Sequence, residues 1–239
     1  MKTLGLIGGL SWESTQTYYR FINQHTRRRL GGLHSAPCLI FSFDFAPIET
    51  LQDRGQWTAL TDELVRAATS LQAAGAQILL ICSNTMHKTA DEMLARVPLP
   101  FLHIADATGA AIRGSGIQSV GLLGTRFTME ESFYRGRLED RFGLRVSIPD
   151  PDDRAIVHET IYEELCRGIV QDSSREHFRG VIRRLVDAGA QGIILGCTEI
   201  GLLISQEDAP VPLFDTTTLH AEAAVDLALR GADPEQNAP

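Results

Sequence analysis

Two side chains capable of nucleophilic or acid–base chemistry, Ser83 and Cys197, occupy matching places in two similar stretches of the chain. Residues 73–85 read AAGAQILLICSNT and residues 187–199 read DAGAQGIILGCTE. A thiolate can act as a nucleophile or as a base, whereas a serine hydroxyl needs a helper group to do either. The alignment predicts one functional site in which the two groups lie on opposite sides of a small anionic ligand.

Two further pairs of motifs repeat in the same order. Residues 3–9 (TLGLIGG) are echoed by residues 119–125 (SVGLLGT), and residues 100–106 (PFLHIAD) by residues 212–218 (PLFDTTT). A repeat of about 115 residues that occurs twice is too long for a solenoid, whose units have about 20 to 50 residues. We therefore expect two similar lobes that face each other.

The composition is typical of a soluble globular protein. Of the 239 residues, 44% are hydrophobic and 22% are charged, and the formal net charge is −8. The basic run Arg27–Arg29 has no interleaved aromatic residues, which is typical of the solvated C-terminal end of a helix and not of a nucleic-acid surface. No apolar run reaches the roughly 18 residues that span a bilayer. We expect a cytoplasmic chain without nucleic-acid or membrane partners.

The cysteines form no CxxC pair and show no metal-ligand spacing with the seven histidines, so we expect free thiols and no metal. Cys38, Cys82 and Cys166 are expected to be small hydrophobic core residues. Cys197 differs because it lies where a strand is expected to give way to a helix, and the positive potential of a helix N-terminus lowers the pKa of a thiol. Cys197 is therefore the candidate base.

Apolar runs alternate with amphipathic stretches along the chain, which predicts a doubly wound α/β fold with mainly parallel sheets flanked by helices. The expected helices include 57–74, 155–167 and 174–188. Gly75 and Gly189 are expected to end helices with positive φ, and residues 231–239 are expected to fray. The expected strands are Leu4–Ile7, Cys38–Phe43, Ile78–Ile81, Phe101–Ile104, Val120–Leu123, Arg145–Ile148, Ile193–Leu195 and Leu213–Phe214.

In open α/β sheets, ligands bind beyond the carboxyl ends of the strands, where helix N-termini present free N–H groups. The turns at 83–85 and 197–199 both follow expected strands. Ser11, Thr125 and Thr128 follow the two glycine-rich strands and could donate hydrogen bonds there. His87 lies one turn after Ser83, and its position fits a capping or core role as well as a supporting role in the site.

Two common chemistries lack their motifs. The segment GLIGGLS follows a strand but does not have the GxGxxG order of a dinucleotide-binding turn. A serine hydrolase of the α/β class would need a GxSxG elbow, and the chain contains none.

The segments GLIGGLSWEST, CSNTMH, PFLHIADAT, LLGTRFTM and GCTEIGLL resemble the aspartate/glutamate racemases. These belong to a superfamily with the glutamate and hydantoin racemases, the maleate isomerases and the arylmalonate decarboxylases. The resemblance extends from about residue 2 to residue 228. It is closest to the enterobacterial aspartate/glutamate racemases, some of which are broad-specificity amino-acid racemases.

The resemblance implies proton transfer without a cofactor, by two acid/base groups on opposite faces of the α-carbon of a small anionic amino acid. It also implies a homodimer. The first lobe would comprise residues 1–98 plus 213–239 and the second residues 99–212, related by a pseudo-twofold axis, with the active site in the cleft between them.

The resemblance assigns roles to individual residues. Cys197 and Ser83 match the catalytic pair, and Glu199 stands where glutamate racemases usually have histidine, which indicates the aspartate-racemase branch. The positions that match residues holding the α-carboxylate and amine are Asn84, Thr85 and Thr198. The positions that match the glycine-rich turns lining the pocket are Ser11 and Thr125.

The chain departs from the family pattern at two places. Most members have cysteine where this chain has Ser83, and this predicts a lopsided racemase that is faster for the enantiomer whose α-proton points at Cys197. Aspartate racemases commonly bind the distal carboxylate with an arginine and a lysine, and here the candidate positions are Gln52 and Cys166. A neutral Gln52 would suit a broader range of substrates.

Two other functions remain open. One is a decarboxylase or isomerase of the same superfamily that acts on a small carboxylic acid, in which Cys197 alone protonates a planar intermediate. The other is a binding protein without enzymatic activity that keeps the anion pocket, since two-lobed α/β architecture also serves ligand capture.

Overall fold

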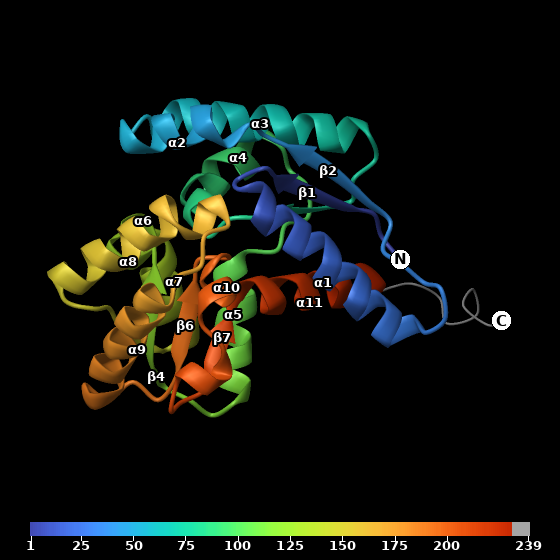
Figure 1. The fold of residues 1–239 in the computed structure, drawn as a ribbon. Coiled ribbons are helices and arrows are strands. Elements are labelled where there is room, and N and C mark those ends of the chain that lie inside the picture. The colour runs from blue at the N-terminus through green and yellow to red at the C-terminus, as the bar shows by residue number, and fades with distance from the viewer. Residues whose placement is uncertain (231–239) are drawn as a thin grey trace. The chain divides into compact units, whose positions relative to one another are not determined.

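The computed structural model describes residues 1–230 and contains two compact units (Figure 1). One unit comprises Met1–His103 together with the chain from His220 onward, and the other comprises Ile104–Leu219. The expectation for residues 231–239 concerns a segment outside the described residues. Within residues 1–230, no helix combines the length and the apolarity that a membrane crossing requires.

The first unit is built on a parallel sheet with the strand order β2-β1-β3. The strands are β1 (Leu4–Gly8), β2 (Cys38–Ser42) and β3 (Ile78–Ile81). The helical segments are α1 (Trp12–Leu30), α2 (Phe45–Asp53), α3 (Trp57–Ala73), a 3₁₀ helix at Thr85–Thr89, α4 (Ala90–Arg96) and the C-terminal α11 (Thr216–Leu229), whose first turn belongs to the second unit.

Both faces of this sheet are covered by helices, because its strands are apolar at every position rather than at alternate ones. One face packs on α3 and α4 through Ile7, Leu79 and Ile81. The opposite face packs on α1 and α11 through Leu4, Leu6, Ile78 and Leu80. Because the strands are parallel, their carboxyl ends lie at the same edge of the sheet, where the polar turns begin.

The second unit contains a parallel sheet with the order β5-β4-β6-β7. The strands are β4 (Ser119–Gly124), β5 (Arg145–Ser147), β6 (Ile193–Gly196) and β7 (Leu213–Asp215). The helices are α5 (Ile104–Gly114), α6 (Arg126–Glu130), α7 (Ser132–Phe142), α8 (Pro151–Glu163), α9 (Asp172–Asp187) and α10 (Ile200–Leu203), with 3₁₀ turns at Leu165–Arg167 and Gln206–Asp208.

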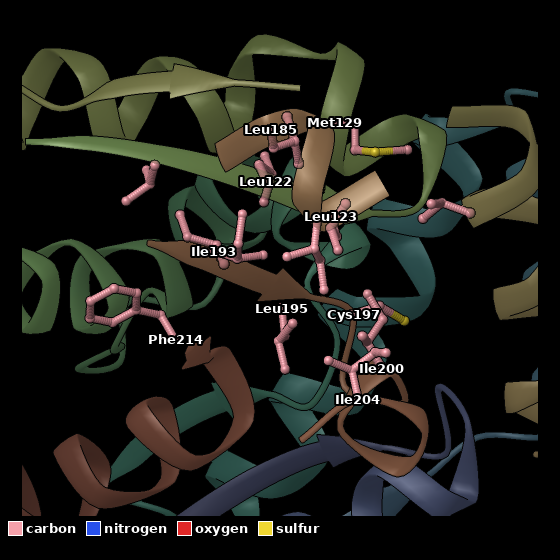
Figure 2. Close-up of a cluster of buried hydrophobic side chains, with 14 of the residues drawn as sticks. Leu122, Leu123, Met129, Leu185, Ile193, Leu195, Cys197, Ile200, Ile204 and Phe214 are labelled. Atoms are coloured by element: carbon pink, nitrogen blue, oxygen red, sulfur yellow. The ribbon is translucent and has the colours of Figure 1, made fainter. Parts of the chain in front are cut away.

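The core of the second unit is a continuous cluster around β4 and β6. The strands contribute Leu122, Leu123, Ile193 and Leu195 (Figure 2). The cluster also includes the buried faces of α5, α8 and α9. The apolar positions of α9 recur at intervals of three and four residues, which is why this otherwise charged helix buries one face.

Strands β5, β4 and β6 of the second sheet have the same order as β2, β1 and β3 of the first, and β7 is an additional strand. Gly5 of β1 pairs with Leu79 of β3, and at the equivalent positions Gly121 of β4 pairs with Ile193 of β6. The expected helix ends are also confirmed, since Gly75 has φ 99° and Gly189 has φ 101°. These φ values strain residues with a Cβ, so glycine stops both helices before the strands that lead to the polar turns.

One expected strand is wrong. Residues 101–104 do not form a strand: Phe101 makes a single parallel bridge to Leu79, and Ile104 begins α5. The prolines at positions 98 and 100 lack the N–H groups that a strand donates to its neighbour. The segment therefore adds one bridge at the sheet edge and then turns into the helix.

Two other interpretations can be compared with the structure. The helix expected at 155–167 begins earlier, at Pro151, because Asp150 caps it and proline is favoured at the first helical position. The basic run does form the last turn of α1. There Arg28 pairs with Glu222 and Arg29 pairs with Asp226. The basic run is therefore the C-terminal end of a helix, as the sequence predicts.

Candidate functional site

Ser83 follows Cys82, the first residue after β3, and is held by the turn that begins there. Its hydroxyl Oγ accepts a hydrogen bond from the Met86 backbone N–H at 3.4 Å, and its carbonyl accepts one from His87 Nδ1 at 2.7 Å. Ser83 is partly exposed, whereas Cys82 is fully buried in the core. The prediction that Cys82 is a small hydrophobic core residue is confirmed.

Ser11 lies at the carboxyl end of β1, next to the end of β3. It is the N-cap of α1 and accepts a hydrogen bond from the Ser14 N–H at 3.4 Å. The Ser14 hydroxyl donates to the Cys82 carbonyl at 2.9 Å. The start of α1 is thereby tied to the strand that carries Ser83.

Three further residues predicted for the site lie in the same unit. Asn84 and Thr85 continue the turn and are buried. Gln52, from α2, is also buried, and its Nε2 contacts Met86 Sδ at 3.0 Å. The structure therefore brings Gln52 to the segment that begins with Ser83.

Cys197 lies at the corresponding place in the second unit, at the end of β6 (Figure 2). Its thiol donates a hydrogen bond to Glu199 Oε2 at 2.9 Å, and the Thr198 hydroxyl donates to the same oxygen at 2.6 Å. All three side chains are buried. A buried carboxylate that accepts from a thiol is placed to take the proton when that thiol ionises.

The expected lowering of the Cys197 pKa is wrong. Burial and the neighbouring Glu199 carboxylate raise the pKa of the Cys197 thiol well above its ordinary value. The helix that follows, α10, is short and extends only from Ile200 to Leu203.

The end of β4 lies beside the end of β6 and contributes Thr125. The strands come together at Gly124 and Gly196, where a Cβ on Gly196 would lie 2.7 Å from the Leu123 carbonyl oxygen. Thr125 caps α6, with its hydroxyl accepting from the Thr128 N–H at 3.3 Å. Both threonines are buried.

The other cysteines pack as core residues, with one qualification. Cys82 is fully buried and Cys38 packs against the same cluster. Cys166 packs against the cluster that contains Cys197, and the charge of Glu199 raises its pKa in addition to burial. Cys166 therefore lies close enough to Glu199 for the carboxylate charge to affect its thiol.

Several residues that hold the site were not predicted from the sequence. Thr15 accepts a hydrogen bond from the Gly9 N–H at 2.8 Å, and Ser14 bridges to β3. The serine and threonine in the segment SWEST could have predicted these contacts, since short hydroxyl side chains favour helix N-termini. The rings of His103 and His220 contact His87 in the turn, and Tyr18 bonds to His220. All three residues are distant from the turn in sequence and carried no local signal.

His220 is buried and neutral in the folded protein. Its Nε2 bonds to the Leu102 carbonyl at 2.9 Å, and its Nδ1 bonds to the Tyr18 hydroxyl at 2.7 Å. A carbonyl only accepts, so Nε2 carries the hydrogen and Tyr18 donates to Nδ1. Burial lowers the pKa of His220 from 6.5 to about 4.

This shift predicts how the stability of the first unit depends on pH. The unfolded chain binds a proton at His220 below about pH 6.5, and the folded chain binds it only near pH 4. The neutral His220 ring therefore makes its full contribution to the free energy of unfolding above pH 6.5. That contribution, about 3 kcal/mol, is lost as the pH falls to 4. Urea unfolding of the wild type and of His220→Gln from pH 7 to pH 4 measures it. Parallel pH curves for the two proteins would contradict the prediction.

No group of His, Cys, Asp and Glu side chains within residues 1–230 is arranged to hold a metal ion. The fold and the polar turns instead define an α/β protein with acid/base groups at the carboxyl ends of equivalent strands.

Comparison with known proteins identifies the family. The chain belongs to the Asp/Glu/Hydantoin racemase family, whose model matches residues 7–224. It is 56% identical to a Yersinia pestis protein assigned as an Asp/Glu racemase, and the crystal structure of that protein matches with a TM-score of 0.89 over 96% of this chain and 100% of that one.

Two other relatives support the same assignment. The chain is 33% identical to an aspartate racemase homologue from Pyrococcus horikoshii, with a TM-score of 0.82 over 95% of this chain and 99% of that one. It is 20% identical to the broad-specificity amino-acid racemase RacX of Bacillus subtilis, over 95% of this chain and 98% of RacX. Family membership supports racemase activity, which is an isomerase reaction.

Proposed function

We propose that the protein is a cofactor-independent racemase that inverts the α-carbon of aspartate, glutamate or a related small amino acid. The observation that carries this proposal is the buried pair at the end of β6, in which the Cys197 thiol donates to Glu199 Oε2 at 2.9 Å. The site would work in a cytoplasmic homodimer, with Cys197 and Ser83 acting on opposite faces of the same α-carbon. Ser11, Gln52, Asn84, Thr85, Thr125 and Thr198 would hold the substrate.

The pair supplies a base in spite of the raised thiol pKa. The proton moves from Sγ to Glu199 Oε2, and the resulting thiolate removes the α-proton and becomes a thiol again. The carbanion is protonated from the Ser83 face, either by the hydroxyl or by a water that it holds. Solvent then returns the proton from Glu199 to the Ser83 side, which restores both groups.

Ser83 is the weaker of the two groups. Within residues 1–230 its hydroxyl has no carboxylate or imidazole partner, and its hydrogen bond is to the Met86 N–H. A hydroxyl in that setting is a poor acid and base. The carbanion should therefore often recover a proton from the Cys197 side and return to the starting enantiomer.

A site with one strong and one weak proton donor would be detected through the face from which the carbanion is reprotonated. Because the two enantiomers have equal free energy in water, kcat/KM is the same in both directions, and kcat can differ only if KM differs in proportion. The asymmetry is instead visible as exchange of the α-proton with solvent without inversion.

The experiment incubates L-aspartate, L-glutamate and L-homoserine with the protein in deuterated water. Proton NMR measures α-deuterium, and chiral chromatography measures the D-enantiomer. Deuterium together with the D-form of any of them supports the racemase. Absence of exchange with every amino acid tested would exclude it and leave the one-cysteine decarboxylase or isomerase, to be assayed with small dicarboxylic acids.

Ser83→Cys should increase inversion relative to exchange. A second thiol is a better proton donor than a hydroxyl, so inversions per exchange event are expected to rise by about tenfold or more. Ser83→Ala is the matched control, since it removes the hydroxyl and should leave exchange while nearly abolishing inversion. An unchanged ratio in Ser83→Cys would show that Ser83 does not limit reprotonation.

A further inference from the structure

Three buried histidine rings lie together behind the Ser83 turn in the first unit. His87 comes from the 3₁₀ helix after β3, His103 from the residue before α5, and His220 from α11. The ring centroid of His87 lies 4.5 Å from that of His103 and 5.7 Å from that of His220. Each of the three is at most 5% exposed.

The hydrogen bond between His87 and Ser83 has only one possible direction. The Ser83 carbonyl can only accept, so His87 Nδ1 must carry the hydrogen that it shares at 2.7 Å. In the neutral ring the lone pair then lies on Nε2. The bond joins the Ser83 carbonyl to a side chain four residues later in the chain.

The surroundings hold this ring in place. The His220 ring meets His87 nearly edge-on, and its own two nitrogens are fixed by Leu102 and Tyr18. Phe101 contacts the other side of the cluster, 5.5 Å from His87 and 6.2 Å from His103 between centroids. An ordinary core position would be filled by aliphatic side chains, whereas here buried polar rings are kept and aligned by hydrogen bonds.

The carbonyl of Ser83 and the N–H of Asn84 belong to the same rigid peptide group. Fixing the carbonyl therefore fixes the direction of that N–H and the backbone from which Ser83 Oγ projects. Among the described residues, the Ser83 hydroxyl has a single, long hydrogen bond, at 3.4 Å from the Met86 N–H. The short bond from His87 is consequently the stronger restraint on the turn.

We propose that His87 is a positioning residue for the Ser83 face, and that its Nδ1–H, held by the His103–His220–Tyr18 cluster, orients the first peptide of the turn for reprotonation of the substrate. This inference rests on the proposed racemase function and adds to it a residue that acts through Ser83.

Asparagine and glutamine separate positioning from proton transfer. The asparagine amide nitrogen is three bonds from Cα, as Nδ1 is in histidine, so it can donate to the Ser83 carbonyl. The glutamine amide nitrogen is four bonds from Cα, as Nε2 is, and is directed past that carbonyl. Neither amide titrates.

The experiment compares His87→Ala, His87→Asn and His87→Gln by inversion kinetics and by α-deuterium exchange. Misplacement of a catalytic group by about 1 Å costs up to about 100-fold in rate, so alanine and glutamine are expected to lower kcat for inversion by roughly 10- to 100-fold. Asparagine should restore most of that loss. Exchange from the Cys197 face should fall less than inversion in the alanine and glutamine variants.

Two outcomes would overturn the proposal. Wild-type kcat and an unchanged ratio of exchange to inversion in His87→Ala would overturn it. Equal impairment of the asparagine and glutamine variants would also overturn it, in favour of proton transfer by the ring. If alanine unfolds the first unit, the asparagine and glutamine pair, which differs by one methylene, still makes the comparison. A wild-type protein without any exchange would instead refute the racemase function itself.

Discussion

Replacing Cys197 with serine should abolish both inversion and α-proton exchange, with rates at least about 10³-fold below wild type. The hydroxyl would keep a hydrogen bond to Glu199 Oε2, which the thiol makes at 2.9 Å. A serine hydroxyl is far less acidic than a thiol, so the carboxylate cannot convert it to a useful base. The measurements are kcat from chiral chromatography and deuterium uptake from NMR, with each substrate that the wild type turns over.

Cys38→Ser is the matched control for the loss of a thiol. Cys38 is half-buried in the first unit and packs at the edge of its core, outside the proposed site. We expect it to keep wild-type turnover, and both variants should unfold at similar urea concentrations to the wild type. Persistence of exchange in Cys197→Ser would show that the thiol is not the base.

The fold was largely predictable from the sequence because the repeat supplies two independent observations of each element. The apolar runs at Ile78–Ile81 and Ile193–Gly196 both form buried strands, and the glycine before each has the expected positive φ. The error at 101–104 arose where two prolines precede the apolar run. Hydrophobicity alone could not show that backbone N–H groups were missing there.

The places of the candidate residues in the fold were predictable, whereas their electrostatics were not. Ser83, Cys197 and Glu199 all follow strands, and strand ends define binding sites in this class of fold. The pKa of Cys197 could not be inferred, because it depends on how deeply the thiol is buried and on where the Glu199 carboxylate points. Neither quantity is encoded in the spacing of residues along the chain.

The histidine cluster shows a second limit. His87 was noticed because it lies close to Ser83 in sequence. His103 and His220 are brought to it by the packing of distant segments, and the Tyr18–His220 bond joins residues that are 202 positions apart. Such contacts follow only from the assembled fold.

Glu199→Gln tests whether the carboxylate is the proton acceptor or only an obstacle to ionisation. Both roles agree with the geometry of the pair, but they predict opposite effects on turnover. The negative charge of Glu199 raises the pKa of the Cys197 thiol, so removing that charge should lower this pKa relative to the wild type. The pH dependence of iodoacetamide alkylation at Cys197 measures that change, and its midpoint should move to lower pH.

If Glu199 receives the thiol proton, glutamine should lower turnover by about 10²- to 10⁴-fold even though the thiol ionises more readily. The amide retains the size of the side chain but cannot accept a proton. Glu164→Gln is the matched control, because Glu164 also accepts a hydroxyl hydrogen bond at 2.6 Å, from Ser174, in the same unit. That variant should keep wild-type turnover. Faster turnover in Glu199→Gln, with the alkylation midpoint moved as expected, would mean that the carboxylate merely suppresses a thiolate that works without it, and the two-step proton transfer from Cys197 would have to be abandoned.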